Sequence, residues 1–152
     1  MFILKFAELD YSGIMGRILA IDYGKKRCGI AVSDPLRIIA TGLQTVPTGQ
    51  LWDFLKDYME KEGVDCVVVG EPRQMDYTPS ESERFITPFV NRFRKAYPQI
   101  PLKRVDERFT SCIAQRSILE MGAKKKQRQD KAVVDKVSAT LILQTYMQFK
   151  NL

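Results

Sequence analysis

Two short apolar runs near the start of the chain predict a β-hairpin. The first run begins after Arg17 and ends at Asp22, and a turn containing Gly24 separates it from the second. Apolar runs of this length joined by a short polar turn are typical of paired strands. Asp34-Pro35 marks the next turn, after which residues 37–46 can form a third strand. The pattern therefore predicts an antiparallel meander.

The apolar spacing then changes to a helical period. Residues 50–62 repeat apolar positions as an amphipathic helix does, and Gly63 stands where a C-terminal cap is expected. Residues 65–70 are continuously apolar, which is typical of a strand buried on both faces in a parallel part of a sheet.

A second helix is predicted from Ser80, with Glu83 as its capping-box partner. Pro88 falls inside this pattern and either kinks the helix or marks its true start. Residues 101–105 form the last predicted strand. A short helix after Thr110 follows.

The final helix is predicted over residues 133–149, after a basic link. Strands that alternate with helices after an antiparallel start predict an α/β protein with a mixed five-stranded sheet, three strands antiparallel and then two parallel. The length fits one domain, expected over residues 15–152, with residues 1–14 a leader or tag-like extension before Met15. The expected apolar face of the final helix consists of Val133, Val134, Val137, Leu141, Ile142, Thr145 and Tyr146.

The absence of histidine narrows the possible chemistry more than any other feature of the composition. It excludes Ser-His-Asp and Cys-His catalysis and every metal site that uses an imidazole. Carboxylates, lysines or metal-bound water must therefore act in any enzyme of this sequence.

Charge and cysteine content indicate the partner and the compartment. The formal charge is +6, with 24 Lys and Arg against 18 Asp and Glu, which favours an anionic partner and nucleic acid first. Cys28, Cys66 and Cys112 lack metal-site or disulfide spacing and are expected to be small buried hydrophobes. With no membrane-length apolar run and no signal peptide, the protein is expected to be cytoplasmic.

Three carboxylates follow or begin predicted elements: Asp22, Glu107 and Asp135. If the first strand and the two parallel strands are neighbours, Asp22 and Glu107 emerge at one edge of the sheet. Asp135 reaches that edge if the final helix starts there. Clustered carboxylates repel one another unless cations compensate, so their convergence would imply one or two Mg²⁺ or Mn²⁺ ions and phosphodiester hydrolysis.

Each acid also has a purely structural interpretation, and the sequence leaves both open. Asp22 can be a turn residue, and Glu107 can pair with Arg108 or Arg104. Asp135 can favour the N-terminus of its helix through the macrodipole.

Other polar residues near these acids could bind phosphates, with an affinity that falls as salt rises. A solvated basic loop and helix capping are the alternatives. The candidate nucleic-acid-binding residues are Gly24, Lys25, Arg108, Thr110, Ser111, Lys124, Lys125, Lys126, Arg128 and Lys131.

Four motifs in order along the chain resemble those of the YqgF family, also called RuvX. They are Ile21-Asp22-Tyr23-Gly24 with Gly29-Ile30-Ala31-Val32, Val68-Val69-Gly70-Glu71-Pro72, Asp106-Glu107-Arg108-Phe109-Thr110-Ser111, and Lys131 to Ala139.

The resemblance implies an RNase H-like fold related to the RuvC Holliday-junction resolvases, with helices on both faces of the sheet. Family members are described as Holliday-junction resolvases and as nucleases in 5′-end maturation of pre-16S rRNA. Asp22, Glu107 and Asp135 fall on the acidic metal-binding positions of the family. The chain departs from the pattern in residues 73–77 and in its first fourteen residues.

A metal-dependent endonuclease acting on pre-16S rRNA is therefore the expected function, with ribosomal precursor particles as possible partners and a monomer or homodimer as the assembly. A Holliday-junction resolvase acting on branched DNA is the alternative. A weakly catalytic nucleic-acid-binding module is another. The Asp22-Tyr23-Gly24 hairpin is also similar to the phosphate loop of sugar kinases and actin-like ATPases, which use two such domains where this chain has length for one.

Overall fold

Five strands form one sheet in the computed structural model, which describes residues 16–72, 81–106 and 131–150. Their spatial order is β3-β2-β1-β4-β5. The strands are β1 (Arg17–Tyr23), β2 (Arg27–Ser33), β3 (Ala40–Pro47), β4 (Val64–Glu71) and β5 (Leu102–Asp106). The helices are the 3₁₀ turn η1 (Thr48–Gln50), α2 (Leu51–Lys61), α3 (Glu83–Ala96) and α6 (Lys131–Lys150).

The strand directions confirm the predicted mixed sheet. β1, β2 and β3 pair antiparallel as a meander, while β4 pairs parallel with β1 and β5 pairs parallel with β4. β1, β4 and β5 therefore finish at one end of the sheet, called the Asp22 end below. The opposite end, where β1 begins and β2 finishes, is called the Asp34 end.

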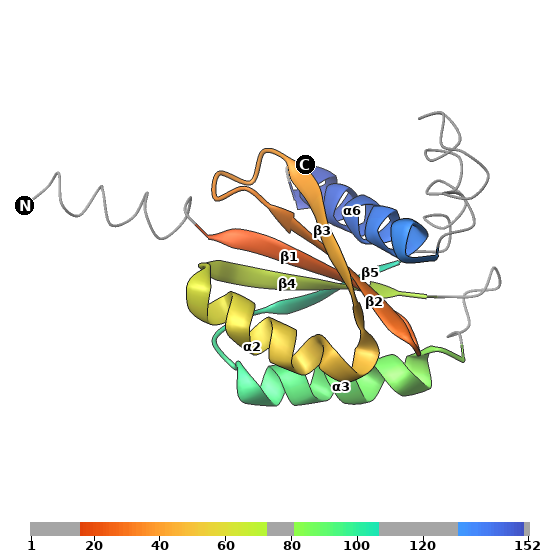
Figure 1. The fold of residues 1–152 in the computed structure, drawn as a ribbon. Coiled ribbons are helices and arrows are strands. Elements are labelled where there is room, and N and C mark those ends of the chain that lie inside the picture. Colours follow the sequence, from red (N-terminus) through yellow and green to blue (C-terminus); the bar gives the residue numbers. More distant parts are fainter. Residues whose placement is uncertain (1–15, 73–80, 107–130, 151–152) are drawn as a thin grey trace, which may run out of the picture.

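Helices cover both faces of the sheet, as expected. Figure 1 shows α2 and α3 side by side on one face and α6 on the other. Alternating side chains of β1 supply the two cores: Leu19 and Ile21 pack toward α2 and α3, and Ile18 and Ala20 pack toward α6. The apolar run of β4 is explained in the same way, because both of its faces are buried.

The predicted start of the second helix is wrong. α3 begins at Glu83, and Ser82 before it forms no side-chain capping hydrogen bond. The Glu83 carboxylate instead pairs with both terminal nitrogens of Arg104 on β5, at 2.9 and 2.8 Å. Pro88 does not mark the start of the helix, since it lies inside α3.

The buried face of α6 also differs from the predicted one. Only Ile142 of the predicted set is fully buried, and Ser138, Ala139 and Leu143 are buried beside it. Small residues face the sheet because α6 lies very close to it: a Cβ atom on Gly42 of β3 would lie 2.8 Å from Lys136 Cγ.

Several sequence predictions lie outside the described residues, including the short helix after Thr110, Cys112 and the extension over residues 1–14. The two cysteines that are described, Cys28 and Cys66, are buried and free, which confirms the prediction for them. In the part of the chain that the structure describes, no helix is long and apolar enough to cross a membrane.

Candidate functional site

Asp22 is the last but one residue of β1, at the end of the sheet where the parallel strands finish. Strand alternation places it on the same face as Ile18 and Ala20, which pack toward α6. In the antiparallel register Asp22 lies opposite Gly29 of β2. The carboxylate is therefore held at the sheet surface directly under the path of α6.

Asp135 reaches this place because Gly29 has no side chain. A Cβ atom on Gly29 would collide with the Asp135 backbone carbonyl, so the helix backbone lies against the strand backbone at this point. The start of α6 is also tied to β3, since Thr45 Oγ1 donates a hydrogen bond to the Ala132 carbonyl at 2.7 Å. Two acids 113 positions apart in the sequence are thus brought to one face of the sheet.

Burial and proximity change the acidity of Asp22. Desolvation by the surrounding protein, followed by repulsion from Asp135, raises the pKa of Asp22 from its ordinary value of 3.8 to about 7. A carboxyl group with such a pKa is poorly stabilised as an anion in this fold. The structural interpretation of Asp22 as an ordinary exposed turn residue is therefore wrong, because it lies in a strand and resists ionisation.

Arg27 provides part of the missing positive charge. Its Nε donates to Asp135 Oδ2 at 3.2 Å, across 108 positions of sequence. The two side chains are 37% and 25% exposed, so solvent weakens the pair. Asp135 is the fifth residue of α6, beyond the first turn to which the macrodipole effect is confined. Its placement therefore follows from the Arg27 pair and Gly29, and not from the helix terminus.

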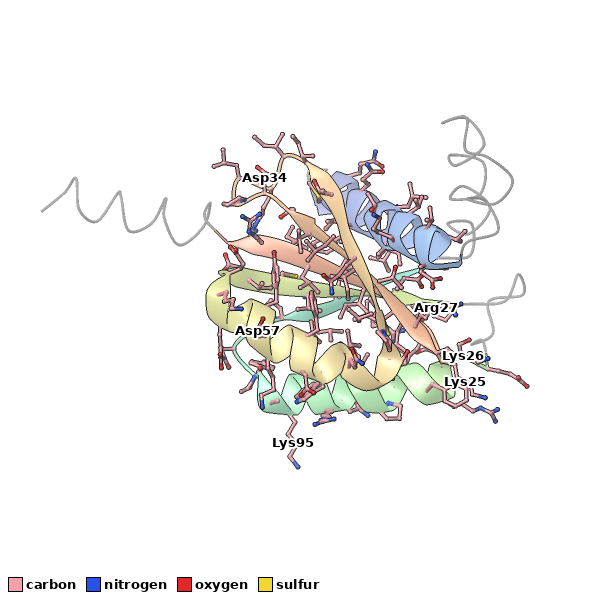
Figure 2. The ribbon with its side chains drawn as sticks, in the orientation of Figure 1. Lys25, Lys26, Arg27, Asp34, Asp57 and Lys95 are labelled. Carbon is pink, nitrogen blue, oxygen red and sulfur yellow. The ribbon has the colours of Figure 1, made fainter. Side chains whose placement is uncertain are left out.

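An open cavity of about 310 Å³ lies beside this pair. It is lined by Gly24 and the three cations that follow it at the end of the β1–β2 hairpin, together with Asp135. Figure 2 shows Lys25, Lys26 and Arg27 gathered at this hairpin tip, near the start of α3. The carbonyl of Gly24 accepts a hydrogen bond from Thr48 Oγ1 at 2.7 Å, and this bond anchors the turn.

The third predicted acid, Glu107, lies outside the described residues. The structure does show that β5 ends at Asp106, paired with Glu71 at the end of β4, and thus at the Asp22 end. The alternative partner Arg104 is occupied by Glu83 and by the carbonyls of Val69 and Gly70. Arg108, Thr110, Ser111, Lys124, Lys125, Lys126 and Arg128 are likewise outside the described residues, and Lys131 is described only as the first residue of α6.

Carboxylate oxygens such as those of Asp22 and Asp135 are the ligands that Mg²⁺ and Mn²⁺ prefer. Within residues 16–72, 81–106 and 131–150, no three acidic or thiol groups gather closely enough to hold a metal ion. Burial raises the pKa of the Cys28 thiol, and this side chain packs in the core on the opposite face of the sheet, under α2 and α3. The donor set on this face is thus a pair of oxygen ligands that a third could complete.

Sequence reasoning missed three contributors to the site. The sequence pattern suggested that Gly29 serves the hairpin or lets a substrate approach the strand, whereas its contact with Asp135 depends on tertiary packing. Lys26 and Arg27 directly follow Lys25 and could have been found from the run of three cations beside a candidate acid.

Sequence comparisons match the chain to one family model and to named relatives. Residues 16–149 match the family model RuvX, described as "Holliday junction resolvase". A protein of Phocaeicola vulgatus named "Putative pre-16S rRNA nuclease" is 59% identical over 137 residues, covering 90% of this chain and 99% of that protein. One of Porphyromonas gingivalis with the same name is also 59% identical, covering 88% and 96% of the two chains.

A solved structure supports the fold. The structure titled "T. thermophilus RuvC in complex with Holliday junction substrate" superposes with a TM-score of 0.53 at 18% identity, covering 88% of this chain and 96% of that one. This likeness confirms the expected RNase H-like fold.

Proposed function

The chain belongs to the RuvX family, and from this premise we propose that it is a metal-dependent nuclease acting in 5′-end maturation of pre-16S rRNA. The reaction is hydrolysis of phosphodiester bonds in structured nucleic acid. The relatives named for pre-16S rRNA nuclease activity, which the chain matches over nearly their full length, support this choice of substrate.

One observation carries the proposal: Asp22 and Asp135 are held on one face of the sheet although their charges repel. Such an arrangement opposes folding unless a cation compensates it. Arg27 Nε donates to Asp135 Oδ2 at 3.2 Å and to no atom of Asp22 in the part of the chain that the structure describes. A divalent cation held by both acids would compensate the repulsion between them.

Asp22, Asp135 and Glu107 would hold one or two Mg²⁺ or Mn²⁺ ions. When bound, such ions lower the pKa of an attacking water and stabilise the charge on the leaving oxygen. The protein itself positions the acids through the Gly29 contact and anchors the neighbouring turn through Thr48. This assignment follows the family motifs and is a prediction for all three acids.

Phosphate binding falls to the cations around the site. Lys25, Lys26 and Arg27 stand at the hairpin tip, and Lys25 and Arg27 line the cavity with Asp135. Arg108, Thr110, Ser111 and the basic stretch over residues 124–131 are predicted to add contacts. Binding should weaken steeply with salt, because contacts to phosphates release counterions.

A Holliday-junction resolvase is the second candidate. It is favoured by the description of the family model and by the likeness to RuvC, whose structure contains a junction. Because that likeness is only 18% identical, it supports the fold and leaves the substrate to experiment. A nucleic-acid-binding module with little turnover would bind RNA or DNA without forming a cleavage product. An ATPase of the actin-like kind would bind ATP in a titration.

The deciding experiment incubates the full chain with a pre-16S rRNA fragment and with a four-way DNA junction, in Mn²⁺, in Mg²⁺ and in chelator. Asp22→Asn is the test variant and Asp65→Asn, an acid of the Asp34 end, is the matched control. We expect metal-dependent cleavage of the RNA that falls at least about a thousandfold in Asp22→Asn and is unchanged in Asp65→Asn.

Cleavage of the junction alone would select the resolvase. Equal cleavage by wild type and Asp22→Asn would contradict the assignment of the site. The proposal includes a cytoplasmic location, and precursor ribosomal particles are the expected partners of a monomer or homodimer. A native-mass measurement with and without the RNA distinguishes the two assemblies.

A further inference from the structure

An aromatic cavity of about 320 Å³ lies on the opposite face of the sheet from Asp22, at the same end of the sheet. Its walls include Tyr23, Trp52, Phe85, Pro88, Phe89 and Arg92, which come from β1, α2 and α3. This set is called the aromatic cavity below. Its volume is at the lower end of the range that accommodates small ligands, about 300–1,000 Å³.

Lining residues of the aromatic cavity contact those of the cavity beside the Arg27–Asp135 pair, which is called the acid-side cavity below. Adjacent residues of β1 point to opposite faces, so Tyr23 lines the aromatic cavity while Asp22 faces α6. Thr48 lines the aromatic cavity, and its hydroxyl donates to the carbonyl of Gly24, which lines the acid-side cavity. A strand of nucleic acid that crosses the end of β1 would therefore pass both cavities.

The rings of the aromatic cavity are held in place by one another. Phe89 is 8% exposed and forms the floor. Its ring centroid lies 5.2 Å from that of Tyr23 and 6.3 Å from that of Trp52, which it meets edge to face. These spacings are those of favourable aromatic pairs. The floor and two walls are therefore preformed.

Cations surround the exposed rings. The Arg92 guanidinium lies 4.0 Å from the Trp52 ring centroid, and Arg84 lies 5.1 Å from that of Phe85. Lys25 Nζ lies 5.3 Å from the Phe85 ring centroid and belongs to a residue that also lines the acid-side cavity. Phe85 itself is 36% exposed, although it is large and apolar.

Aromatic faces interleaved with Lys and Arg bind single-stranded nucleic acid, because every base has a face that stacks and every nucleotide carries a phosphate. An apolar peptide would not require the cations. A free anion would not require the rings. The combination fits an unpaired nucleotide better than either.

We propose that the aromatic cavity binds an unpaired nucleobase of a strand whose backbone passes over the end of β1 toward Asp22 and Asp135. The nuclease would then cut next to a single-stranded position in otherwise structured nucleic acid. This choice of cleavage position rests on the proposed function, whereas binding of the base does not.

The test uses the fluorescence of Trp52, the only tryptophan in the chain. The full chain is titrated in chelator with a four-nucleotide oligoadenylate as RNA, the same strand as DNA, and an abasic strand of equal length and charge. We expect both adenylate strands to quench Trp52 and to bind at least about fivefold more tightly than the abasic strand, since stacking on aromatic side chains adds affinity per base. Equal affinities for adenylate and abasic strands would overturn the proposal.

Phe85→Leu removes the exposed ring and keeps an apolar side chain. It should bind the abasic strand as wild type does and lose most of the preference for adenylate. Phe54→Leu is the matched control, because Phe54 stacks on Tyr58 within α2 and does not line the aromatic cavity. Circular dichroism confirms that both variants fold. Loss of preference in both variants alike, or in neither, would contradict a specific role for Phe85 in base binding.

Cleavage assays on the same variants separate this proposal from the proposed function. If wild type cuts a stem next to an unpaired adenosine and an abasic position equally well, the aromatic cavity plays no part in cleavage. If no variant cuts but the adenylate preference is present, base binding stands and the proposed nuclease function fails.

Discussion

The two ends of the sheet treat their acids in opposite ways. At the Asp34 end, Asp34 accepts hydrogen bonds from the backbone N–H groups of Ile38 and Ile39 at 2.7 and 2.8 Å. These bonds lower the pKa of Asp34, and the bond from Ile39 contributes most. Asp65 pairs with Arg37 at 2.9 Å. Acids at this end are stabilised as anions and fasten a loop to the strands.

At the Asp22 end, burial and Asp135 raise the pKa of Asp22 to about 7. Among the residues that the structure describes, no backbone amide or cation bonds to the Asp22 carboxylate, and Arg27 serves Asp135. The acids of the Asp34 end stabilise the folded state through their hydrogen bonds and ion pair. Ionised Asp22 instead destabilises the folded state. An electrostatically unfavourable group kept at the end of parallel strands indicates a binding site more strongly than a well-paired one does.

The largest effect on stability is expected where α6 meets β2. Gly29→Ala places a methyl group against the Asp135 carbonyl, which cannot yield without moving the helix. We expect a loss of about 2–3 kcal/mol in the free energy of unfolding, as in overpacked cores. Gly49→Ala is the control, because a Cβ atom there would have no neighbour within 4 Å. Urea unfolding measures the loss in the free energy of unfolding for each variant. Equal losses in the two variants would contradict the close contact between α6 and β2.

Asp22→Asn should stabilise the protein in chelator at neutral pH. The folded-state pKa of about 7 lies above the ordinary 3.8, so the favourable contribution of protonated Asp22 is complete below about pH 4 and lost as pH rises to 7. Removing the charge should therefore raise the free energy of unfolding by on the order of 2 kcal/mol at pH 8, with no gain at pH 4.

Asp34→Asn should show the opposite dependence. Because the pKa of Asp34 is lowered, its contribution is present above pH 4 and lost in acid, so the variant is destabilised at pH 8 and approaches wild type as pH falls. Unfolding both variants from about pH 2 to pH 8 measures the contrast, because the Asp34 contribution is lost only below about pH 4. If the free energy of unfolding depends on pH in the same way in Asp22→Asn and Asp34→Asn, the two ends of the sheet do not differ as described.

A smaller effect is expected from the arginines of the two ends. Arg27→Gln should cost about 0.5–1 kcal/mol in chelator, since its pair with Asp135 is partly exposed. Millimolar Mg²⁺ should reduce that cost, because the bound ion compensates Asp135 in place of the guanidinium. The cost of Arg37→Gln, at the Asp34 end, should be the same with and without Mg²⁺. Thermal unfolding of both variants gives the comparison.

Much of the fold could be predicted because it depends on local patterns. The apolar runs of β1, β2 and β4 and the short turns between the first three strands predict an antiparallel meander followed by parallel strands. The start of α3 could not be predicted, because Glu83 is taken by Arg104, 21 positions away. The buried face of α6 could not be predicted either. Ser138 and Ala139 are buried against the sheet because Gly29 and Gly42 allow the helix to pack closely on it.

The candidate acids were chosen by position in the sequence, and the structure describes two of the three. The hairpin pattern placed Asp22 at a strand end, the helical pattern placed Asp135 near the start of the final helix, and both fall on family motif positions. The Arg27 pair joins residues 108 positions apart, and the raised pKa of Asp22 depends on burial, so neither could be obtained from spacing alone. Glu107 and the basic stretch over residues 124–131 stay predictions.

Calorimetric titration with Mn²⁺ near pH 7 tests most directly whether the Asp22 end is a cation site. Wild type, Asp22→Asn and Asp34→Asn are titrated in two buffers of different ionisation enthalpy. Wild type and Asp34→Asn should bind Mn²⁺ with release of a proton, since the pKa of Asp22 is about 7. Asp22→Asn should bind at least about tenfold more weakly and release none. Equal affinity and equal proton release in Asp22→Asn would contradict the account.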